Sequence, residues 1–426
     1  MSTLAQEAAV AAASIVASAA AHRYLYLRLV KDVTVSARLR RAGRAAAIAL
    51  TILVPAGVLT AQYANPTRIA WLAWPAFVWV AMAAHLLMTL VVLEIPVRLM
   101  ARALRRRAGS SSVVLAQAPR APVVQQGDSA AALVTGDTNP GPPEDAAFRM
   151  LDRRLVLTRS VALLATSSAA ATTGYGFHRG LGAPDVKVVP VALPRLHPSL
   201  DGMRITMAGD LHLGPFFGRA HTARMVRMIN DTSPDLVAIV GDLSDGSADD
   251  LAAHAAPLTR LSSTHGAFFV TGNHDYRHDV DAWIATLADF RVTTLRNTRT
   301  LIEHRGGAID LAGVTDVTGE QNHDAPDYDR ALGDRDSSHP VVLLAHQPVQ
   351  VHEAARHKVD LQLSGHTHGG AFFPGNLLVP LTQPVTAGLA TIDHTQLYVT
   401  RGVGASLPPI RVGAPPDITV IELRRP

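Results

Sequence analysis

Long apolar runs separated by arginine-rich segments occupy the first part of the chain. These runs lie at about residues 4–22, 45–62, 69–93 and 160–177. A helix needs about 20 apolar residues to cross a bilayer. The run at 69–93 fits best, because tryptophans near its start suit a membrane interface. The run at 4–22 fits least well, since it is mostly alanine, which is only marginally hydrophobic. We therefore expect about four transmembrane helices before residue 182.

From residue 203 the pattern changes to short apolar strands that alternate with amphipathic helices. The expected strands are 203–208, 235–240, 267–270, 308–313, 340–345, 359–363, 395–400 and 418–423. The clearest helix is 279–289, where apolar residues recur at helical spacing from Val280 to Leu287. This alternation predicts an α/β domain with strands inside, helices outside and functional loops at the strand ends.

Composition divides the chain into four regions. We expect a membrane region at 1–107, a disordered cytoplasmic linker rich in Pro, Gly, Ser and Ala at 108–150, a fourth membrane segment at 151–182 and a globular domain at 183–426. The globular domain would begin with an extended, proline-containing connection at 183–200.

The distribution of basic residues predicts the orientation in the membrane. Arginine and lysine cluster at 28–44, 98–107 and 153–159, whereas the short connection at 63–68 holds one arginine. The positive-inside rule places the three basic clusters in the cytoplasm. The chain is therefore expected to be a multi-pass protein of the cell membrane, with its globular domain outside the cytoplasm.

Composition also limits the chemistry. The chain has no cysteine, so disulfides and thiolate metal ligands are excluded. The formal net charge of +4 is carried almost wholly by arginine. The globular half has no lysine-rich stripe, which argues against a nucleic-acid partner. Arg153-Arg154 resembles a twin-arginine export signal, but the same pair also serves as the positive anchor of a membrane helix.

Five of the expected strands end in a carboxylate, an amide or an imidazole, mostly after glycine. These endings are Asp210 with His212, Asp242, Asn273 with His274 and Asp275, His346, and His366 with His368. One such ending is common in turns, but turn chemistry does not account for five in one domain. Oxygen and nitrogen donors suit Mn, Fe or Zn, and two such ions about 3.5–4 Å apart can clamp a phosphate and activate a water.

The ordered set Asp-x-His, Gly-Asp, Gly-Asn-His-Asp, His and Gly-His-x-His resembles the calcineurin-like metallophosphoesterase family over roughly residues 203–423. The resemblance implies a two-sheet β-sandwich flanked by helices, and two divalent metal ions. By position, one ion would be held by Asp210, His212, Asp242 and His368, and the other by Asp242, Asn273, His346 and His366. Asp242 would then bridge the two ions. His274 would be the catalytic residue beside them, with Asp275 as an adjacent carboxylate that could hold it.

Other positions refine this resemblance. Position 245 is aspartate where purple acid phosphatases have tyrosine, and 246 is glycine where serine/threonine phosphatases have arginine. Thr400-Arg401-Gly402-Val403-Gly404 resembles a membrane-associated bacterial branch of the family. The apolar residues at 372–379 are expected in the core or a hairpin, and the alternative is an apolar lip that meets lipid or an acyl substrate.

Together these features predict a membrane-anchored phosphoesterase. It would hydrolyse a phosphodiester, phosphomonoester or pyrophosphate bond by attack of metal-bound hydroxide, on a phosphorylated small molecule or on a lipid or cell-envelope substrate. One alternative is a non-catalytic membrane receptor or scaffold that keeps the fold, but every ligand position is occupied, which argues against it. Another is a transporter with an appended domain. The few polar residues inside the apolar runs, chiefly Glu7 and His85, argue against this class.

Overall fold

The structure is a computed structural model of the whole chain, and it describes residues 3–63, 70–115, 144–372, 375–405 and 408–426. The chain forms two compact units. One comprises Met1–Ile52 with Met82–Ala171, and the other comprises Leu53–Ala81 with Thr172–Pro426. The second unit contains the sandwich and every candidate site residue.

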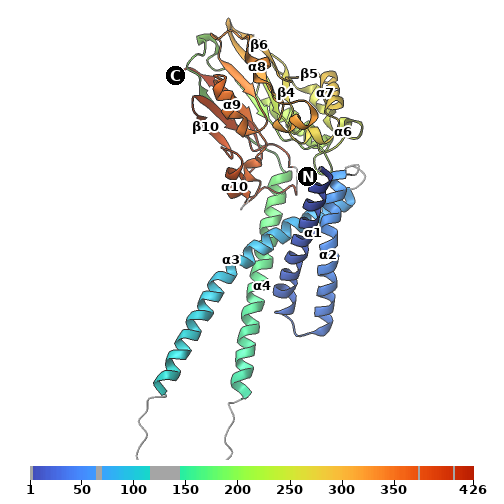
Figure 1. Cartoon of the computed structure of the whole chain (residues 1–426), viewed down its shortest axis with the longest axis vertical. Helices are drawn as coiled ribbons and strands as arrows, with labels where there is room; N and C mark the ends of the chain where they lie inside the picture. Colours follow the sequence, from blue (N-terminus) through green and yellow to red (C-terminus); the bar gives the residue numbers. More distant parts are fainter. Residues whose placement is uncertain (1–2, 64–69, 116–143, 373–374, 406–407) are drawn as a thin grey trace, which may run out of the picture. The chain divides into compact units, whose positions relative to one another are not determined.

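Four long helices precede the sandwich (Figure 1). They are α1 (Thr3–Tyr26), α2 (Ala37–Tyr63), α3 (Ala70–Leu115) and α4 (Glu144–Leu181), and a short π-helical segment, Leu27–Lys31, follows α1. Within the described residues, two stretches are long and apolar enough to cross a membrane, Ala73–Pro96 in α3 and Leu155–Leu181 in α4.

The expectation of about four spanning helices is therefore supported for two of them. The candidates at 4–22 and 45–62 are helical, within α1 and α2, but the described parts of these helices do not meet the same criterion. Both candidates extend beyond the residues whose side chains the structure describes, so these two spans stay a prediction.

The predicted linker at 108–150 is only partly a connection. Helix α3 continues through 108–115, and α4 begins at Glu144. Arginine and alanine favour helix strongly, so α3 extends beyond its apolar part. Residues 116–143 lie outside the described residues.

Two six-stranded mixed sheets face each other in the second unit (Figure 1). The first has the order β1 (Asp185–Ala192), β12 (Asp417–Arg424), β2 (Arg204–Ala208), β3 (Leu236–Val240), β4 (Ala267–Val270) and β5 (Val292–Thr294). The second has the order β10 (Gly388–Ile392), β11 (Thr395–Val399), β9 (Leu361–Ser364), β8 (Val341–Leu344), β7 (Gly307–Gly313) and β6 (Thr298–His304). Strands β2 to β5 run parallel, as do β7, β8, β9 and β11.

The period-two pattern of the strands accounts for the layers. In β3, Leu236, Ala238 and Val240 enter the core between the sheets, whereas Val237 and Ile239 pack under helices. The helices on the first sheet are α5 (Arg219–Asp231), α6 (Ala248–Ala255) and α7 (Val280–Asp289), and those on the second are α8 (Tyr328–Leu332) and α9 (Val351–Arg356). The predicted two-sheet α/β sandwich is thus confirmed.

The eight expected strands correspond to β2, β3, β4, β7, β8, β9, β11 and β12, and four further strands were not expected. The clearest of these is β1, which occupies part of the proline-containing connection and pairs with β12 along its whole length. It is an edge strand, and an edge position tolerates Pro190 because one side of the strand needs no hydrogen-bond donor.

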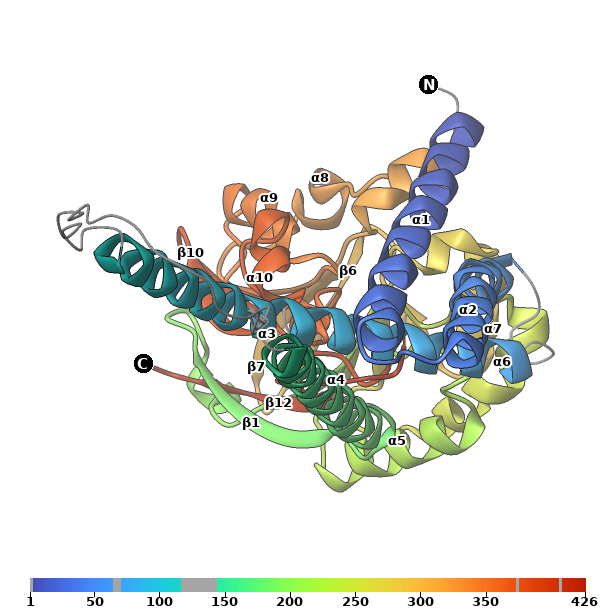
Figure 2. The same ribbon diagram turned by 90° about the horizontal axis from the view of Figure 1, so that it is seen from below.

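The last turns of α4 are attached to the sandwich. Arg224 of α5 donates a hydrogen bond to the carbonyl oxygen of Leu181 at 3.0 Å, and in Figure 2 α5 lies beside the end of α4 that joins the sandwich. The backbone N–H of Arg411 donates to the carbonyl oxygen of Gly176, also at 3.0 Å. The end of this candidate membrane helix is therefore fixed to the domain that carries the predicted motifs.

Candidate metal centre

The predicted strand-end residues meet at one end of the sandwich. Asp210, Asp242 and Asn273 follow β2, β3 and β4, which are parallel neighbours in the first sheet. His346 and His366 follow β8 and β9, which are parallel neighbours in the second. Because the carboxyl ends of parallel strands lie along the same sheet edge, residues far apart in the sequence converge.

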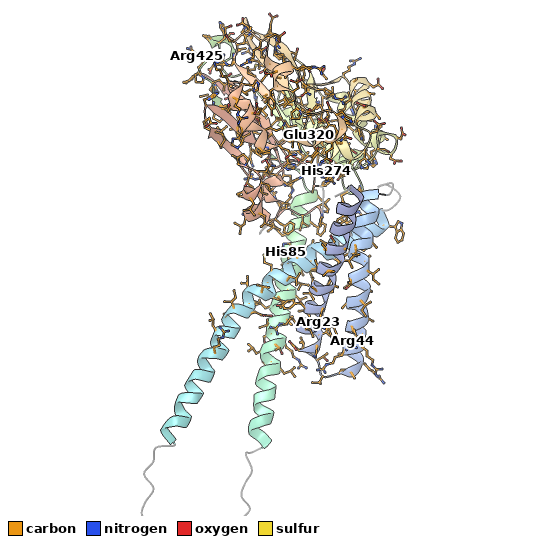
Figure 3. All side chains as sticks on the ribbon, viewed as in Figure 1. Arg23, Arg44, His85, His274, Glu320 and Arg425 are labelled. Carbon is orange, nitrogen blue, oxygen red and sulfur yellow. The ribbon has the colours of Figure 1, made fainter. Side chains whose placement is uncertain are left out.

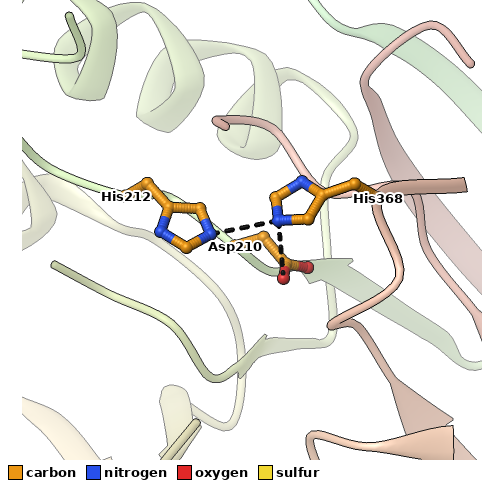
Figure 4. Close-up of side chains that lie close together, drawn as sticks. All are labelled: Asp210, His212 and His368. Atoms are coloured by element: carbon orange, nitrogen blue, oxygen red, sulfur yellow. Dashed lines mark hydrogen bonds and ion pairs between the residues drawn. The ribbon is translucent and has the colours of Figure 1, made fainter. Parts of the chain in front are cut away.

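Asp210, His212 and His368 form the first donor group (Figure 4). The Nε2 atoms of the two histidines are 3.1 Å apart, and His368 Nε2 lies 3.5 Å from Asp210 Oδ1. His212 Nδ1 is 3.0 Å from Asp245 Oδ1. A carboxylate can only accept, so Nδ1 carries the proton and Nε2 presents a lone pair to the group. This is the arrangement that a metal ligand requires.

Asp242, His346 and His366 form the second group, together with Asn273. Asn273 Oδ1 lies 2.8 Å from His366 Nδ1 and 3.2 Å from His346 Nε2. His346 Nδ1 donates to the carbonyl oxygen of Val240 at 2.7 Å, which leaves Nε2 as the free lone pair. The four side chains present oxygen and nitrogen atoms to a common space.

Asp242 lies between the two groups. Its Oδ2 is 3.6 Å from His212 Nε2 in the first group and 3.3 Å from His346 Nε2 in the second. Its Oδ1 accepts the backbone N–H of His274 at 2.8 Å. One oxygen therefore faces both groups while the other fixes the orientation of the carboxylate.

The electrostatics of the site fit cations. Asp210 and Asp242 are buried, and burial together with the charge of Asp242 raises the pKa of Asp210 to about 6. Burial would lower the pKa of His212, but the carboxylates around it, Asp245 first, outweigh burial and raise this pKa to about 9. The carboxylates of the site thus stabilise positive charge beside His212. Its oxygen and nitrogen donors, without thiolate, suit two divalent ions such as Mn, Fe or Zn.

The backbone at the strand ends adopts an uncommon conformation. The φ angles of Asp210, His212, Asp242, His366 and His368 are 54°, 46°, 53°, 72° and 52°. A left-handed conformation costs a non-glycine residue about 1–3 kcal/mol and concentrates at functional sites.

Two motif glycines permit the close packing around these residues. A Cβ at Gly272 would lie 2.3 Å from Asp242 Oδ1, and one at Gly402 would lie 2.6 Å from Asp210 Cβ. Gly402 also has a φ of +71°, which favours glycine.

His274 lies beside the two groups, at the end of the sandwich where Figure 3 labels it. Its Nδ1 is 2.6 Å from Asp245 Oδ1, and its side chain is partly exposed. Burial would raise the pKa of Asp245, but His212 and His274 outweigh burial and hold it below its usual range. The carboxylate that holds His274 is therefore Asp245.

Asp275, the neighbour in sequence, has a different role. It accepts the backbone N–H groups of Asp242, Leu243 and Gly272 at 3.0, 2.9 and 2.7 Å. It thus fixes the loops that carry Asp242 and Asn273 and does not hold His274. The only sequence signal for the true partner was an aspartate three residues after Asp242.

Arg411 is a second site residue that the sequence did not predict. Its buried guanidinium donates to the carbonyl oxygen of His368 at 2.6 Å, to His368 Nδ1 at 2.8 Å and to the carbonyl oxygen of Gly404. Burial lowers its pKa to about 10. The backbone N–H of Arg411 donates to the carbonyl oxygen of Gly176, so Arg411 connects the end of α4 to the candidate metal ligand His368. A charged residue in the apolar run 408–412 was its only signal.

Comparison with known proteins agrees with this geometry. The profile of the calcineurin-like phosphoesterase family matches residues 203–370. An uncharacterized metallophosphoesterase of Helicobacter pylori is 39% identical over 251 residues, which are 58% of this chain and 66% of that protein. A bovine transmembrane protein with a metallophosphoesterase domain is 37% identical over 285 residues, 64% of each chain. The chain thus spans slightly less than two thirds of these two relatives.

An uncharacterized metallophosphoesterase of Bacillus subtilis is matched over almost its entire length. The two sequences are 31% identical over 290 residues, which are 65% of this chain and 99% of the relative. With the motif residues assembled at one end of a two-sheet sandwich, the chain belongs to the calcineurin-like metallophosphoesterase family.

Proposed function

We propose that this chain is a membrane-anchored, dinuclear metal-dependent phosphoesterase whose catalytic domain is residues 183–426. The observation that carries the proposal is the position of Asp242. A single oxygen of this carboxylate faces His212 on one side and His346 on the other. Two donor groups that share one carboxylate oxygen suit two cations held close together.

The residues fall into two ligand sets. Asp210, His212, Asp242 and His368 would hold one ion, and Asp242, Asn273, His346 and His366 would hold the other. When bound, two such cations neutralise charge on a phosphate group and make a water molecule more nucleophilic.

His274 would supply the proton for the leaving oxygen. Its Nδ1–H donates to Asp245, so the second ring nitrogen, Nε2, is the one free to carry and release a proton. The carboxylate of Asp245 accepts this hydrogen bond and fixes the orientation of the ring. Because the side chain of His274 is partly exposed, substrate can reach it.

The domain would act at a membrane, outside the cytoplasm. Two apolar helical stretches and relatives that are transmembrane proteins support the anchoring. The basic clusters at 98–107 and 153–159 follow the first stretch and flank the start of the second. Both clusters therefore face the cytoplasm, and the domain after α4 lies on the opposite side. The substrate would be a phosphomonoester, phosphodiester or pyrophosphate on a small molecule, a lipid or a cell-envelope component.

An assay of the purified full-length chain in detergent tests this proposal. The protein is stripped of metal, supplied with Mn²⁺ and offered nitrophenyl phosphate, bis-nitrophenyl phosphate and pyrophosphate. We expect metal-dependent hydrolysis of at least one substrate, which Asp242→Asn should abolish together with tight binding of both ions. Two bound ions per chain without hydrolysis would favour the receptor or scaffold class. Hydrolysis that Asp242→Asn leaves intact would refute the shared ligand.

A further inference from the structure

Three leucines stand out on the surface of the sandwich, in a segment that follows the loop of His366 and His368. They are Leu377, Leu378 and Leu381, with 60%, 60% and 79% of their surface exposed. They belong to the short helices α10 (Gly375–Leu378) and Val379–Leu381, and we call them the apolar lip. Among the described residues after 182, these are the most exposed large apolar side chains. Exposed apolar patches of this kind mark interaction surfaces.

Hydrogen bonds on both sides of the apolar lip fix its backbone to the sandwich. Gln383, two residues after Leu381, is buried, and its side-chain oxygen accepts the backbone N–H of Val349 at 2.9 Å. The side-chain nitrogen of Gln383 donates to Gln347 Oε1 at 3.2 Å. At the other end, the N–H of Gly375 donates to the carbonyl oxygen of Phe372 at 2.7 Å. The leucines are therefore held outward by polar anchors on both sides.

A short series of backbone contacts connects the lip to the candidate membrane helix α4. Gly176 of α4 accepts the N–H of Arg411, and the next residue, Val412, donates to the carbonyl oxygen of Ala371 at 3.1 Å. Phe372 also forms a β-bridge with Val412. Gly375 follows Phe372 by three residues, so it lies within about 11 Å of that bridge. Figure 1 shows α10 at the end of the sandwich from which α4 extends.

This connection places the lip at the level of a membrane surface. Gly176 is five residues before the end of the apolar stretch Leu155–Leu181, or about 7.5 Å along a helix axis. The headgroup layer on each side of a bilayer is about 5–8 Å thick. Side chains beside Gly176 are thus at the depth where apolar chains meet headgroups.

A second contact brings the loop after His212 to the same level. Phe216, in the loop after His212, makes edge-to-face contacts with Trp74 and Phe77 of α3, at centroid distances of 4.7 and 5.4 Å. Trp74 also stacks on Phe177 of α4 at 6.2 Å. Aromatic residues near the ends of apolar helices are typical of the membrane interface.

We propose that the apolar lip inserts into the bilayer leaflet that α4 enters, and that the metal centre acts on phosphate groups carried by membrane lipids. The occupant of the lip is lipid, since a chain anchored beside it by a spanning helix keeps the leucines permanently at the bilayer surface. The insertion rests on geometry alone, whereas the lipid-phosphate substrate rests on the proposed phosphoesterase function.

The insertion is tested by fluorescence. The natural chain has no cysteine, so a single Leu378→Cys in the full chain takes one environment-sensitive label. In phosphatidylcholine vesicles that contain bromine-labelled lipids, we expect strong quenching at this position. The matched control is Leu301→Cys, an exposed leucine of β6 outside the lip. Equal quenching at both positions would overturn the proposal, as would concentration-dependent disulfide dimers through Leu378→Cys, because a second copy would then cover the lip.

The substrate class is tested by comparing two phosphomonoesters in the same vesicles. One is soluble nitrophenyl phosphate and the other is phosphatidic acid within the bilayer. Changing Leu377, Leu378 and Leu381 to serine should lower turnover of phosphatidic acid by about 10-fold or more, given the apolar area removed, with nitrophenyl phosphate turnover unchanged. Leu301→Ser should change neither.

The outcomes separate the two proposals. Equal effects of the serine changes on both substrates, or none on phosphatidic acid, would overturn the role of the lip in substrate access. No hydrolysis of either substrate by the unaltered chain would refute the phosphoesterase function, and the quenching result would still decide where the lip lies.

Discussion

Asp245 offers a sharp test of how the metal centre is organised, because one of its oxygens serves two histidines. Oδ1 accepts from His212 Nδ1 at 3.0 Å and from His274 Nδ1 at 2.6 Å. The first histidine is a candidate metal ligand and the second is the candidate proton donor. Asp245→Asn keeps the size of the side chain and one acceptor oxygen but removes the charge. It should therefore weaken metal binding and proton donation by separate routes.

The expected magnitudes follow from the two contacts. Removing the partner that orients a metal-bound histidine typically lowers metal affinity 10–100-fold, which is about 1.4–2.8 kcal/mol. That range matches the worth of one hydrogen bond to a charged group, about 1.5–3 kcal/mol. His274 keeps its ring and an acceptor for Nδ1–H, but its hydrogen bond is no longer made to a charged group. We therefore expect turnover at saturating metal to fall roughly 10–100-fold, less than the 10²–10⁴-fold usual for losing an acid–base group.

The assay titrates the metal-free protein with Mn²⁺ and then measures turnover of nitrophenyl phosphate and of an alkyl phosphate at saturating metal. The matched control is Asp249→Asn, which removes an exposed carboxylate of α6. If excess metal restores full turnover, the contact between Asp245 and His274 does not contribute to catalysis. If metal affinity is unchanged, the contact with His212 does not support binding. If both stay within twofold of the unaltered protein, the reasoning about the shared oxygen is refuted.

Three further predictions concern single residues. His274→Ala should keep its metals and lower turnover roughly 10²–10⁴-fold, with a smaller loss for nitrophenolate than for alkyl leaving groups. An equal loss for both leaving groups would argue against proton donation, and loss of metal would show that His274 is a metal ligand. Arg411→Lys keeps the charge but loses the paired hydrogen bonds to the carbonyl oxygens of His368 and Gly404, which fix the backbone of this ligand. Metal affinity should therefore fall roughly 10-fold, and an unchanged titration would contradict the positioning role of Arg411. A cysteine at Ser337 should react with an impermeant thiol reagent in intact cells, and one at Ser129 should not. The reverse pattern would refute the proposal that the catalytic domain lies outside the cytoplasm.

The sequence predicted most of the strands and the residues at their ends, because both are local patterns. A run such as Leu236–Val240 is recognisable as a strand from its apolar, β-branched composition. The motifs Gly-Asp and Gly-Asn-His that follow such strands are visible without knowing the fold. The strand β1 was missed because Pro190 argues against a strand until the edge position is known. Two of the four expected spans are supported by the structure, and those at 4–22 and 45–62 stay predictions.

The partners of the site residues could not be predicted in the same way. The sequence pointed to Asp275 as the partner of His274 because the two are adjacent. In the structure Asp275 accepts backbone N–H groups, and Asp245 holds His274. Arg411 reaches His368 across 43 residues, from a segment without a recognisable motif. Such contacts depend on how loops from different strands meet, which no local pattern records.

The left-handed backbone of the candidate ligands restricts how this centre can change during evolution. Asp210, His212, Asp242, His366 and His368 combine two requirements, a donor atom and a tolerance for positive φ. Aspartate, asparagine and histidine are the residue types that tolerate this conformation best after glycine, and they are also oxygen and nitrogen donors. A drift in metal preference is thus confined to exchanges among these types. Glutamate, cysteine or tyrosine would first require the turns themselves to be rebuilt.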